Sequence, residues 1–150
     1  MDWQQNIVDT DTALASLLKS VRRIAVLGIK TEQESQKPAF YVAEYLASVG
    51  YDIVPVPVYY PDVTEILGRR VYRSLRDIPG EIDMVDVFRR PADIPPHLED
   101  ILAKRPASVW FQLGIRNDQA AEKLARAGIT VVQDRCTLAE HRRLLGGRHL

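Results

Sequence analysis

The sequence contains a single cysteine, Cys136, among its 150 residues. One cysteine excludes an intrachain disulfide and any metal cluster built on several thiolates. Lysine and arginine balance aspartate and glutamate, 20 against 20, so the chain lacks the net charge that attracts nucleic acid or an anionic membrane. No apolar run approaches the roughly 20 residues of a membrane span. We therefore expect a cytoplasmic protein with no nucleic-acid partner and no membrane partner, in which any anion site is local.

Length and composition are those of one ordinary globular domain. A chain of 150 residues with 46% hydrophobic and 27% charged residues can bury a sizeable core. There is no repeat, low-complexity tract or internal boundary. We expect one domain over residues 1–150, with an N-terminal helix over about 10–21 and a short, frayed C-terminal tail at GGRHL. The oligomeric state stays open.

Short apolar segments alternate with amphipathic segments along the chain. The apolar segments at 24–28, 51–58, 82–88, 108–114 and 129–134 predict strands. Helical spacing predicts helices between Pro38 and Gly50, at 94–104, at 118–127 and after Thr137, and a short helix at 64–67. This alternation over short links predicts an α/β fold. We expect a Rossmann-like, doubly wound, five-stranded parallel sheet with helices on both faces.

Local signals refine two of these segments. Pro55 and Pro57 remove ladder donors, so strand pairing should fail near the end of the second strand. Thr137 and Glu140 match the S/T-x-x-E capping box, which predicts Thr137 as the residue that caps the final helix.

Positive side chains recur in the loops that follow the predicted strands. Right-handed crossovers bring all these loops to one edge of a parallel sheet, which is where ligands bind in such folds. Most of the cations precede a helix, whose dipole already places about half a positive charge at its start. They predict a site for a polyanion held by side chains and free backbone N–H groups. The alternative is that they pair with nearby acids such as Asp93, Asp118 and Asp134. The cations are Lys30, Arg89, Arg90, Arg116 and Arg135.

The loop after the first strand lacks the dinucleotide fingerprint. That fingerprint requires G-x-G-x-x-G after strand one and an acid at the end of strand two. Here strand one leads into G-I-K-T-E-Q, and strand two ends V-P-V-Y-Y with no acid before Asp62. Binding of NAD through this fingerprint is therefore disfavoured.

Residue pairs suited to catalysis are few. Cys136 and His141 could form a nucleophile and base only if their side chains converged, and five residues along one helix place them on different azimuths. Asp83 and Asp86 lie three positions apart in a predicted strand, so they face opposite sides. No metal-ligand spacing occurs. The residues leave enzymatic activity open and favour a protein without it, with no catalytic and no metal-binding residues.

Six stretches follow one another from Ile24 to His141: IAVLG, PAFYVAEYLASVGYDIVPV, EILGRRVYRSLRDIP, IDMVDVFRRPADIP, VWFQLGIRN and DRCTLAEH. In this order they resemble the small, single-domain CoA-binding protein family, whose fold is similar to the CoA-binding domain of the succinyl-CoA synthetase alpha subunit. Two positions depart from the usual pattern. The sequence has Ile29 after the glycine, where a small residue is usual, and V-P-V-Y-Y where V-N-P usually ends strand two.

The resemblance implies that coenzyme A, or an acyl-CoA, binds with its nucleotide end over the carboxyl edge of the sheet. A polyphosphorylated ligand suits the basic loops, and it requires no acid on strand two. The implied contacts are Gly28, Ile29 and Lys30 at the nucleotide, Lys37 and Pro38 at the helix start, Val56, Pro57, Val58 and Tyr59 beside the adenosine, Phe88, Arg89 and Arg90 in the third loop, and Gln112, Leu113 and Gly114 in the fourth.

Three functional hypotheses follow. The first is non-catalytic binding of coenzyme A or an acyl-CoA, with a small-molecule nucleotide as the ligand. The second is a nucleotide-dependent enzyme, such as an NAD(P)-dependent oxidoreductase. The third is a degenerate Rossmann scaffold that binds partner proteins and no ligand.

Overall fold

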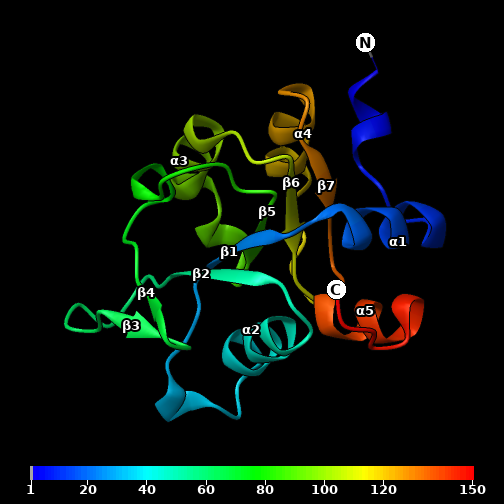
Figure 1. The fold of residues 1–150 in the computed structure, drawn as a ribbon. Helices are drawn as coiled ribbons and strands as arrows, with labels where there is room; N and C mark the ends of the chain where they lie inside the picture. The colour runs from blue at the N-terminus through cyan, green and yellow to red at the C-terminus, as the bar shows by residue number, and fades with distance from the viewer. Residues whose placement is uncertain (1) are drawn as a thin grey trace.

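The computed structural model describes residues 2–150 and contains one five-stranded, fully parallel sheet. Its strand order is β2-β1-β5-β6-β7 (Figure 1). The strands are β1 (Arg23–Leu27), β2 (Asp52–Val56), β5 (Met84–Val87), β6 (Ser108–Phe111) and β7 (Thr130–Val132). Parallel pairing places all five carboxyl ends at the same edge of the sheet.

Helices cover both faces of the sheet. Helices α1, α2 and α5 pack on one face, and α3 and α4 pack on the other (Figure 1). Their bounds are α1 (Asp11–Ser20), α2 (Pro38–Ser48), α3 (Leu98–Lys104), α4 (Asp118–Arg126) and α5 (Thr137–Leu145). Short 3-10 turns lie at Trp3–Asn6, Glu32–Glu34, Leu75–Asp77, Pro91–Asp93 and Pro95–His97. The predicted doubly wound α/β fold is confirmed.

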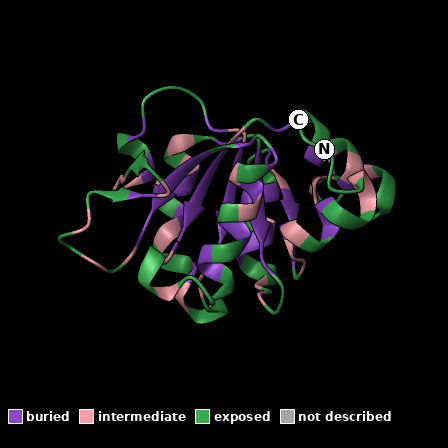
Figure 2. Cartoon of the chain, turned by 60° about the horizontal axis from the view of Figure 1, so that its bottom comes forward, coloured by how far each residue is buried: buried purple, intermediate pink, exposed green. Residues whose placement is uncertain are grey.

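Each face of the sheet has its own apolar core. Successive side chains of a strand point to opposite faces, so Ile24 and Val26 pack beneath α1 and α2 while Ala25 and Leu27 pack toward α3 and α4. The strands are accordingly buried along almost their whole length, and they lie at the centre of Figure 2. Burial on both faces explains why the strand sequences are continuous apolar runs.

The strand order reverses between β1 and β5. From β1 the chain crosses to β2 on one side and then returns to β5 on the other. The connection after β1 therefore runs toward one side of the sheet and the connection after β5 toward the other, so the loops that follow β1 and β5 diverge at this point. Ligands in open α/β sheets bind at such a reversal, which here lies beyond Leu27 and Val87.

Three local predictions need correction. The segment predicted as a short helix at 64–67 is a hairpin of β3 (Glu65–Ile66) and β4 (Arg69–Arg70). The third helix begins at Leu98 rather than at residue 94, because prolines at 95 and 96 form a 3-10 turn first. Cys136 is the N-cap residue of α5, and Thr137 is the first helical residue with its hydroxyl turned to buried Asp86. The prediction that pairing fails near the end of the second strand is confirmed, since β2 ends at Val56.

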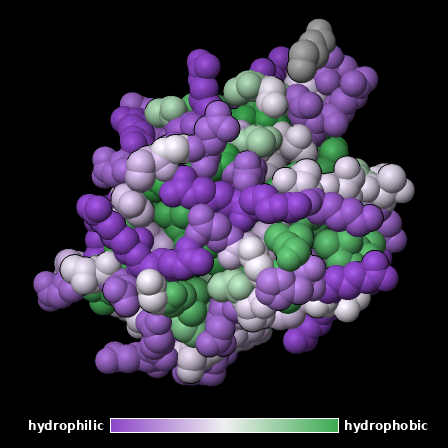
Figure 3. Space-filling view, viewed as in Figure 1, coloured by the Kyte–Doolittle hydropathy of each residue, from purple (hydrophilic) through white to green (hydrophobic). Residues whose placement is uncertain are grey.

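The surface seen from the side of Figure 1 is mostly hydrophilic, with apolar atoms visible in separate patches (Figure 3). Within residues 2–150, no helix combines the length and apolar character needed to cross a membrane. Over the same residues, no group of histidine, cysteine, aspartate and glutamate side chains could hold a metal ion.

Candidate site at the reversal of strand order

The backbone at Gly28 joins three strand ends. Its N–H donates to the Val56 carbonyl oxygen at 2.9 Å, and the Phe88 N–H donates to the Leu27 carbonyl oxygen at 2.9 Å. Gly28 has a φ of +88°, and a Cβ built on it would lie 2.4 Å from the Phe88 carbonyl oxygen. The glycine is therefore required by the protein's own third loop.

Ile29 lies inside the core. Its side chain is 1% exposed and packs among the residues beneath α1 and α2. The larger isoleucine side chain therefore does not extend onto the outer surface of the loop. The chain emerges again at Lys30, whose N–H donates to the Ala39 carbonyl oxygen at 3.0 Å and so fixes the loop against the start of α2.

Two lysines flank one carboxylate at the start of α2. The Glu34 carboxylate lies 3.9 Å from Lys30 Nζ and 4.0 Å from Lys37 Nζ, and it accepts a hydrogen bond from the Tyr60 hydroxyl. Burial, followed by this hydrogen bond, raises the pKa of Tyr60 to about 12. Lys37 is the N-cap residue of α2, Pro38 is its first residue, and no side chain caps the helix. Pro38 has no N–H, and the Phe40 and Tyr41 N–H groups donate to the Lys37 carbonyl oxygen at 2.9 and 3.0 Å, so the Ala39 N–H is the first-turn donor that remains beside the two lysines.

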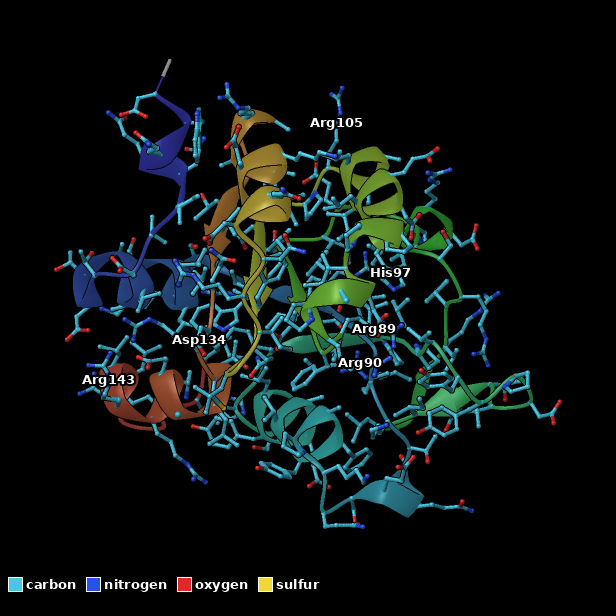
Figure 4. The ribbon with its side chains drawn as sticks, turned by 180° about the vertical axis from the view of Figure 1, so that it is seen from behind. Arg89, Arg90, His97, Arg105, Asp134 and Arg143 are labelled. Carbon is cyan, nitrogen blue, oxygen red and sulfur yellow. The ribbon has the colours of Figure 1, made fainter. Side chains whose placement is uncertain are left out.

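The loop after β5 provides two arginines with different environments. The Arg89 side chain is 15% exposed, its guanidinium lies 3.9 Å from Asp93 and 5.8 Å from the centre of the Tyr59 ring, and its Nε is buried without a hydrogen-bond partner. The Arg90 side chain is 83% exposed and donates to Asp93 at 2.9 Å. Burial and the Arg89 charge lower the pKa of His97, which lies on the same side (Figure 4).

The segment after β2 lines a pocket of about 590 Å³. Val56 and Pro57 are buried, whereas Tyr59 is 58% exposed. Arg73 fixes the segment by donating to the carbonyl oxygens of Tyr59, at 2.8 Å, and Tyr60, at 2.5 Å. The pocket is lined by Val58, Tyr59, Tyr60, Pro61 and Arg73.

The five predicted cations do not form one cluster. Arg116 and Arg135 line a separate pocket of about 240 Å³ beside the end of β7, where Arg116 pairs with Asp118 at 3.2 Å and Arg135 with Glu140 at 3.3 Å. Figure 4 shows Arg89 and Arg90 together above the start of α2, while Asp134, beside Arg135 in the chain, lies on the side of α5. The alternative of pairing with nearby acids is therefore observed for Arg90 with Asp93 and for Arg116 with Asp118, whereas Arg135 pairs with Glu140.

The predicted residues of the fourth loop, after β6, make contacts within the protein or face solvent. The Gln112 amide donates to Asp86 at 2.6 Å and to Thr137 at 2.8 Å, inside the core. Leu113 is 71% exposed, and the Gly114 N–H donates to the Asp134 carboxylate at 2.6 Å. The structure thus brings the predicted residues of the first three loops together and leaves Gln112 with a structural partner.

Asp86 is a fully buried carboxylate beneath α5. Burial raises its pKa to about 7, although hydrogen bonds from Gln112 and Thr137 favour the charged form. Asp83 instead accepts from the backbone N–H groups of Arg22 and Arg23 at the opposite end of β5. The two aspartates therefore share no proton, as the spacing predicts.

Cys136 and His141 do not form a catalytic pair. His141 is fully buried, and its Nδ1 shares a hydrogen bond of 2.7 Å with the Tyr45 hydroxyl. Burial lowers its pKa. Cys136 is half-buried and packs against the apolar core.

Two residues of the site, Glu34 and Arg73, are not among the sequence predictions, and a third, Tyr60, appears there only within the V-P-V-Y-Y segment. Glu34 lies four positions after Lys30, a spacing that suggests an ion pair. Tyr60 has a φ of +64°, which nothing in its residue type indicates. Arg73 reaches the site from a loop, and only the folded chain shows that it lies near Tyr59.

The fold and the site define a class of protein: a doubly wound α/β domain with a cationic site where the strand order reverses. The sequence model of the CoA binding domain family matches residues 22–142. The chain belongs to this family, and the recognition made from the order of its motifs is confirmed.

The chain is also similar to a curated protein and to solved structures. The uncharacterized protein YneT of Bacillus subtilis is 33% identical over 128 residues, covering 85% of this chain and 91% of YneT. The structure of cell-free ID.343 from Thermus thermophilus is 40% identical with a TM-score of 0.83, covering 91% of this chain and 99% of that one. A dinucleotide-forming acetyl-coenzyme A synthetase from Ca. Korarchaeum cryptofilum is 20% identical with a TM-score of 0.61, covering 77% of this chain and 27% of that one, so it shares the fold.

Proposed function

We propose that this protein binds coenzyme A or an acyl-CoA, without catalysis, at the reversal of strand order in its sheet. The ligand is a small nucleotide, and the expected setting is the cytoplasm. Membership of the CoA binding domain family supports the ligand class. The location supports it too, because Gly28, Tyr59 and Arg89 come from the three loops that meet where such folds bind nucleotides.

The observation that carries the proposal is the environment of Arg89. Its Nε is one of two buried side-chain polar atoms without a partner in residues 2–150. A buried donor without an acceptor is costly, and a guanidinium hydrogen-bonds most strongly to phosphate or carboxylate oxygens. Asp93 lies 3.9 Å away, too far for a direct hydrogen bond. The group therefore has unused capacity for an anion that approaches through the site.

The carboxylates near the site reduce its charge without cancelling it. Lys30, Lys37, Arg89 and Arg90 face two carboxylates, so a formal excess of two positive charges remains. The lysines and Arg89 are each 3.9 to 4.0 Å from their carboxylates. Such loose pairs leave their N–H donors available, which favours a phosphate ligand.

Tyr59 provides a platform for the base of the nucleotide. Its ring is more than half exposed at the mouth of the 590 Å³ pocket, beside the Arg89 guanidinium. Aromatic rings stack on nucleobases with about 1–3 kcal/mol per base. This arrangement supports adenine on Tyr59 and phosphates toward Arg89 and the lysines.

Calorimetric titration and thermal shift with CoA, dephospho-CoA and NADH test the proposal. A ligand at about 100 times its Kd should stabilise the protein by about 2.7 kcal/mol. We expect binding of CoA, weaker binding of dephospho-CoA and no binding of NADH. Binding of NADH with no response to CoA would favour the oxidoreductase, and no response to any of the three would favour the scaffold. Hydrolysis or transfer of an acyl group from bound acetyl-CoA would overturn the non-catalytic part.

A further inference from the structure

The Glu34 carboxylate lies between the two lysines of the site. It lies 3.9 Å from Lys30 Nζ and 4.0 Å from Lys37 Nζ, beside the uncapped start of α2. These are the groups that a phosphate would contact. A carboxylate in this position occupies the space that a phosphate would fill, and it partly neutralises the positive charge that would attract the phosphate.

Only one of the two Glu34 carboxylate oxygens is held by a side-chain hydrogen bond. One carboxylate oxygen accepts from the Tyr60 hydroxyl, whereas the other lies beyond hydrogen-bond distance of both ammonium groups. The two lysines therefore gain charge balance from Glu34 and keep their N–H donors. An incoming phosphate gives them both balance and hydrogen bonds.

A second carboxylate anchors the same loop. Glu32 accepts a hydrogen bond of 2.8 Å from the Leu67 N–H at the turn between β3 and β4. Leu67 and Tyr60 both have positive φ values, +55° and +64°. The loop that carries Glu34 is thus bonded to two residues with unusual backbone conformations, through the Tyr60 hydroxyl and the Leu67 N–H.

We propose that Glu34 is a specificity-determining residue that competes with the ligand's phosphate for Lys30 and Lys37. Bound ligand displaces its carboxylate from between the ammonium groups. Glu34 thereby lowers affinity for phosphorylated ligands in general and reserves the site for ligands with further contacts, such as those at Tyr59 and Arg89. This inference rests on the proposed function for the identity of its ligand.

Replacement Glu34→Gln isolates the charge. The glutamine amide oxygen can still accept from the Tyr60 hydroxyl, so the loop keeps its hydrogen bond. Glu32→Gln is the matched control, because it removes one negative charge from the same loop and its amide oxygen can still accept from Leu67. The two variants have the same net charge and differ in which carboxylate they lose.

Calorimetric titration of wild type and both variants with CoA and with inorganic pyrophosphate is the test. We expect Glu34→Gln to bind both ligands about tenfold more tightly, since one like charge near the anion is removed, and Glu32→Gln to stay within about twofold of wild type.

The outcomes separate the two proposals. Equal CoA affinity in wild type and Glu34→Gln overturns the role of Glu34 and leaves the proposed function standing. Tighter pyrophosphate binding by Glu34→Gln, with no CoA binding by any variant, supports the role of Glu34 and overturns the proposed function. Equal gains in both variants reduce the effect to net charge and overturn this inference. Absence of binding by every variant overturns both.

Discussion

The Phe88 carbonyl oxygen lies 2.4 Å from the position that a Cβ on Gly28 would take. Because Gly28 has no side chain, the loop after β5 can lie against the loop after β1 with Arg89 beside Tyr59. The geometry of the site therefore requires a residue without a Cβ atom at position 28. A substitution that adds it should alter both stability and binding.

Gly28→Ala should destabilise the protein by roughly 2–4 kcal/mol, because it adds a backbone clash to the strain of a positive φ. Gly128→Ala is the matched control. Gly128 has a φ of +85°, close to that of Gly28, and open space around it. It should cost only about 1 kcal/mol. Denaturant unfolding measures both free energies, and equal losses would show that the Phe88 contact yields to the methyl group.

Asp86 should make stability depend on pH. Its pKa is raised from 3.8 to about 7 in the folded protein, so the folded state binds a proton more tightly than the unfolded chain. The free energy of unfolding should therefore be greatest below about pH 4 as far as this group is concerned, and it should fall by roughly 4 kcal/mol as pH rises to about 7.

Asp86→Asn should flatten that part of the profile. The asparagine carbonyl can face the Gln112 amide, and its amino group can face the Thr137 hydroxyl, so the buried contacts survive without the charge. Urea unfolding at several pH values compares the variant with wild type, and Asp62→Asn, an exposed change, serves as control. Parallel profiles for wild type and Asp86→Asn would contradict the prediction.

Arg89→Ala should weaken CoA binding at least tenfold, since a mostly buried, incompletely bonded guanidinium is lost from the site. Arg148→Ala, an exposed change in the C-terminal tail, should have no effect. Arg135→Ala should also leave CoA affinity unchanged, because Arg135 lines the separate pocket beside β7. Titration calorimetry measures all three, and a loss at Arg135 equal to that at Arg89 would mean that the two pockets share one ligand.

Arg73→Ala should loosen the segment from Val58 to Val63. Arg73 donates to three backbone carbonyl oxygens there, at Tyr59, Tyr60 and Val63, and lysine cannot reproduce that forked geometry. We expect faster proteolytic cleavage in this segment for both Arg73→Ala and Arg73→Lys. Hydrogen exchange of the β1 amides provides the control and should stay unchanged. Unaltered cleavage in the alanine variant would show that the segment holds its shape without Arg73.

Residue patterns predict the sheet and its helices well, because burial on both faces leaves little choice of residue in the strands. The hairpin at 65–70 was missed for a physical reason. Its turn places Leu67 at a positive φ, where leucine is rare, and a hydrogen bond from the Leu67 N–H to Glu32 compensates. Such a bond joins residues 35 positions apart and leaves no local signal.

The sequence predicts where the site lies, but it predicts only some of the residues that form it. Parallel topology places Lys30 and Arg89 at one edge, which the sequence alone indicates. Whether each cation is free or paired depends on side-chain reach over a few ångströms. Asp93 lies near both Arg89 and Arg90. Arg135, which lines the pocket beside β7, pairs with Glu140.

The bond between Glu32 and the Leu67 N–H links the lysine loop to an exposed turn at the rim of the molecule. Surface turns ordinarily accept insertions without consequence for distant sites. In this protein a peptide inserted beside Gly68 would pull on the loop that carries Glu34. The same linkage makes the turn a suitable position for an environment-sensitive dye, which would convert displacement of that loop into an optical signal.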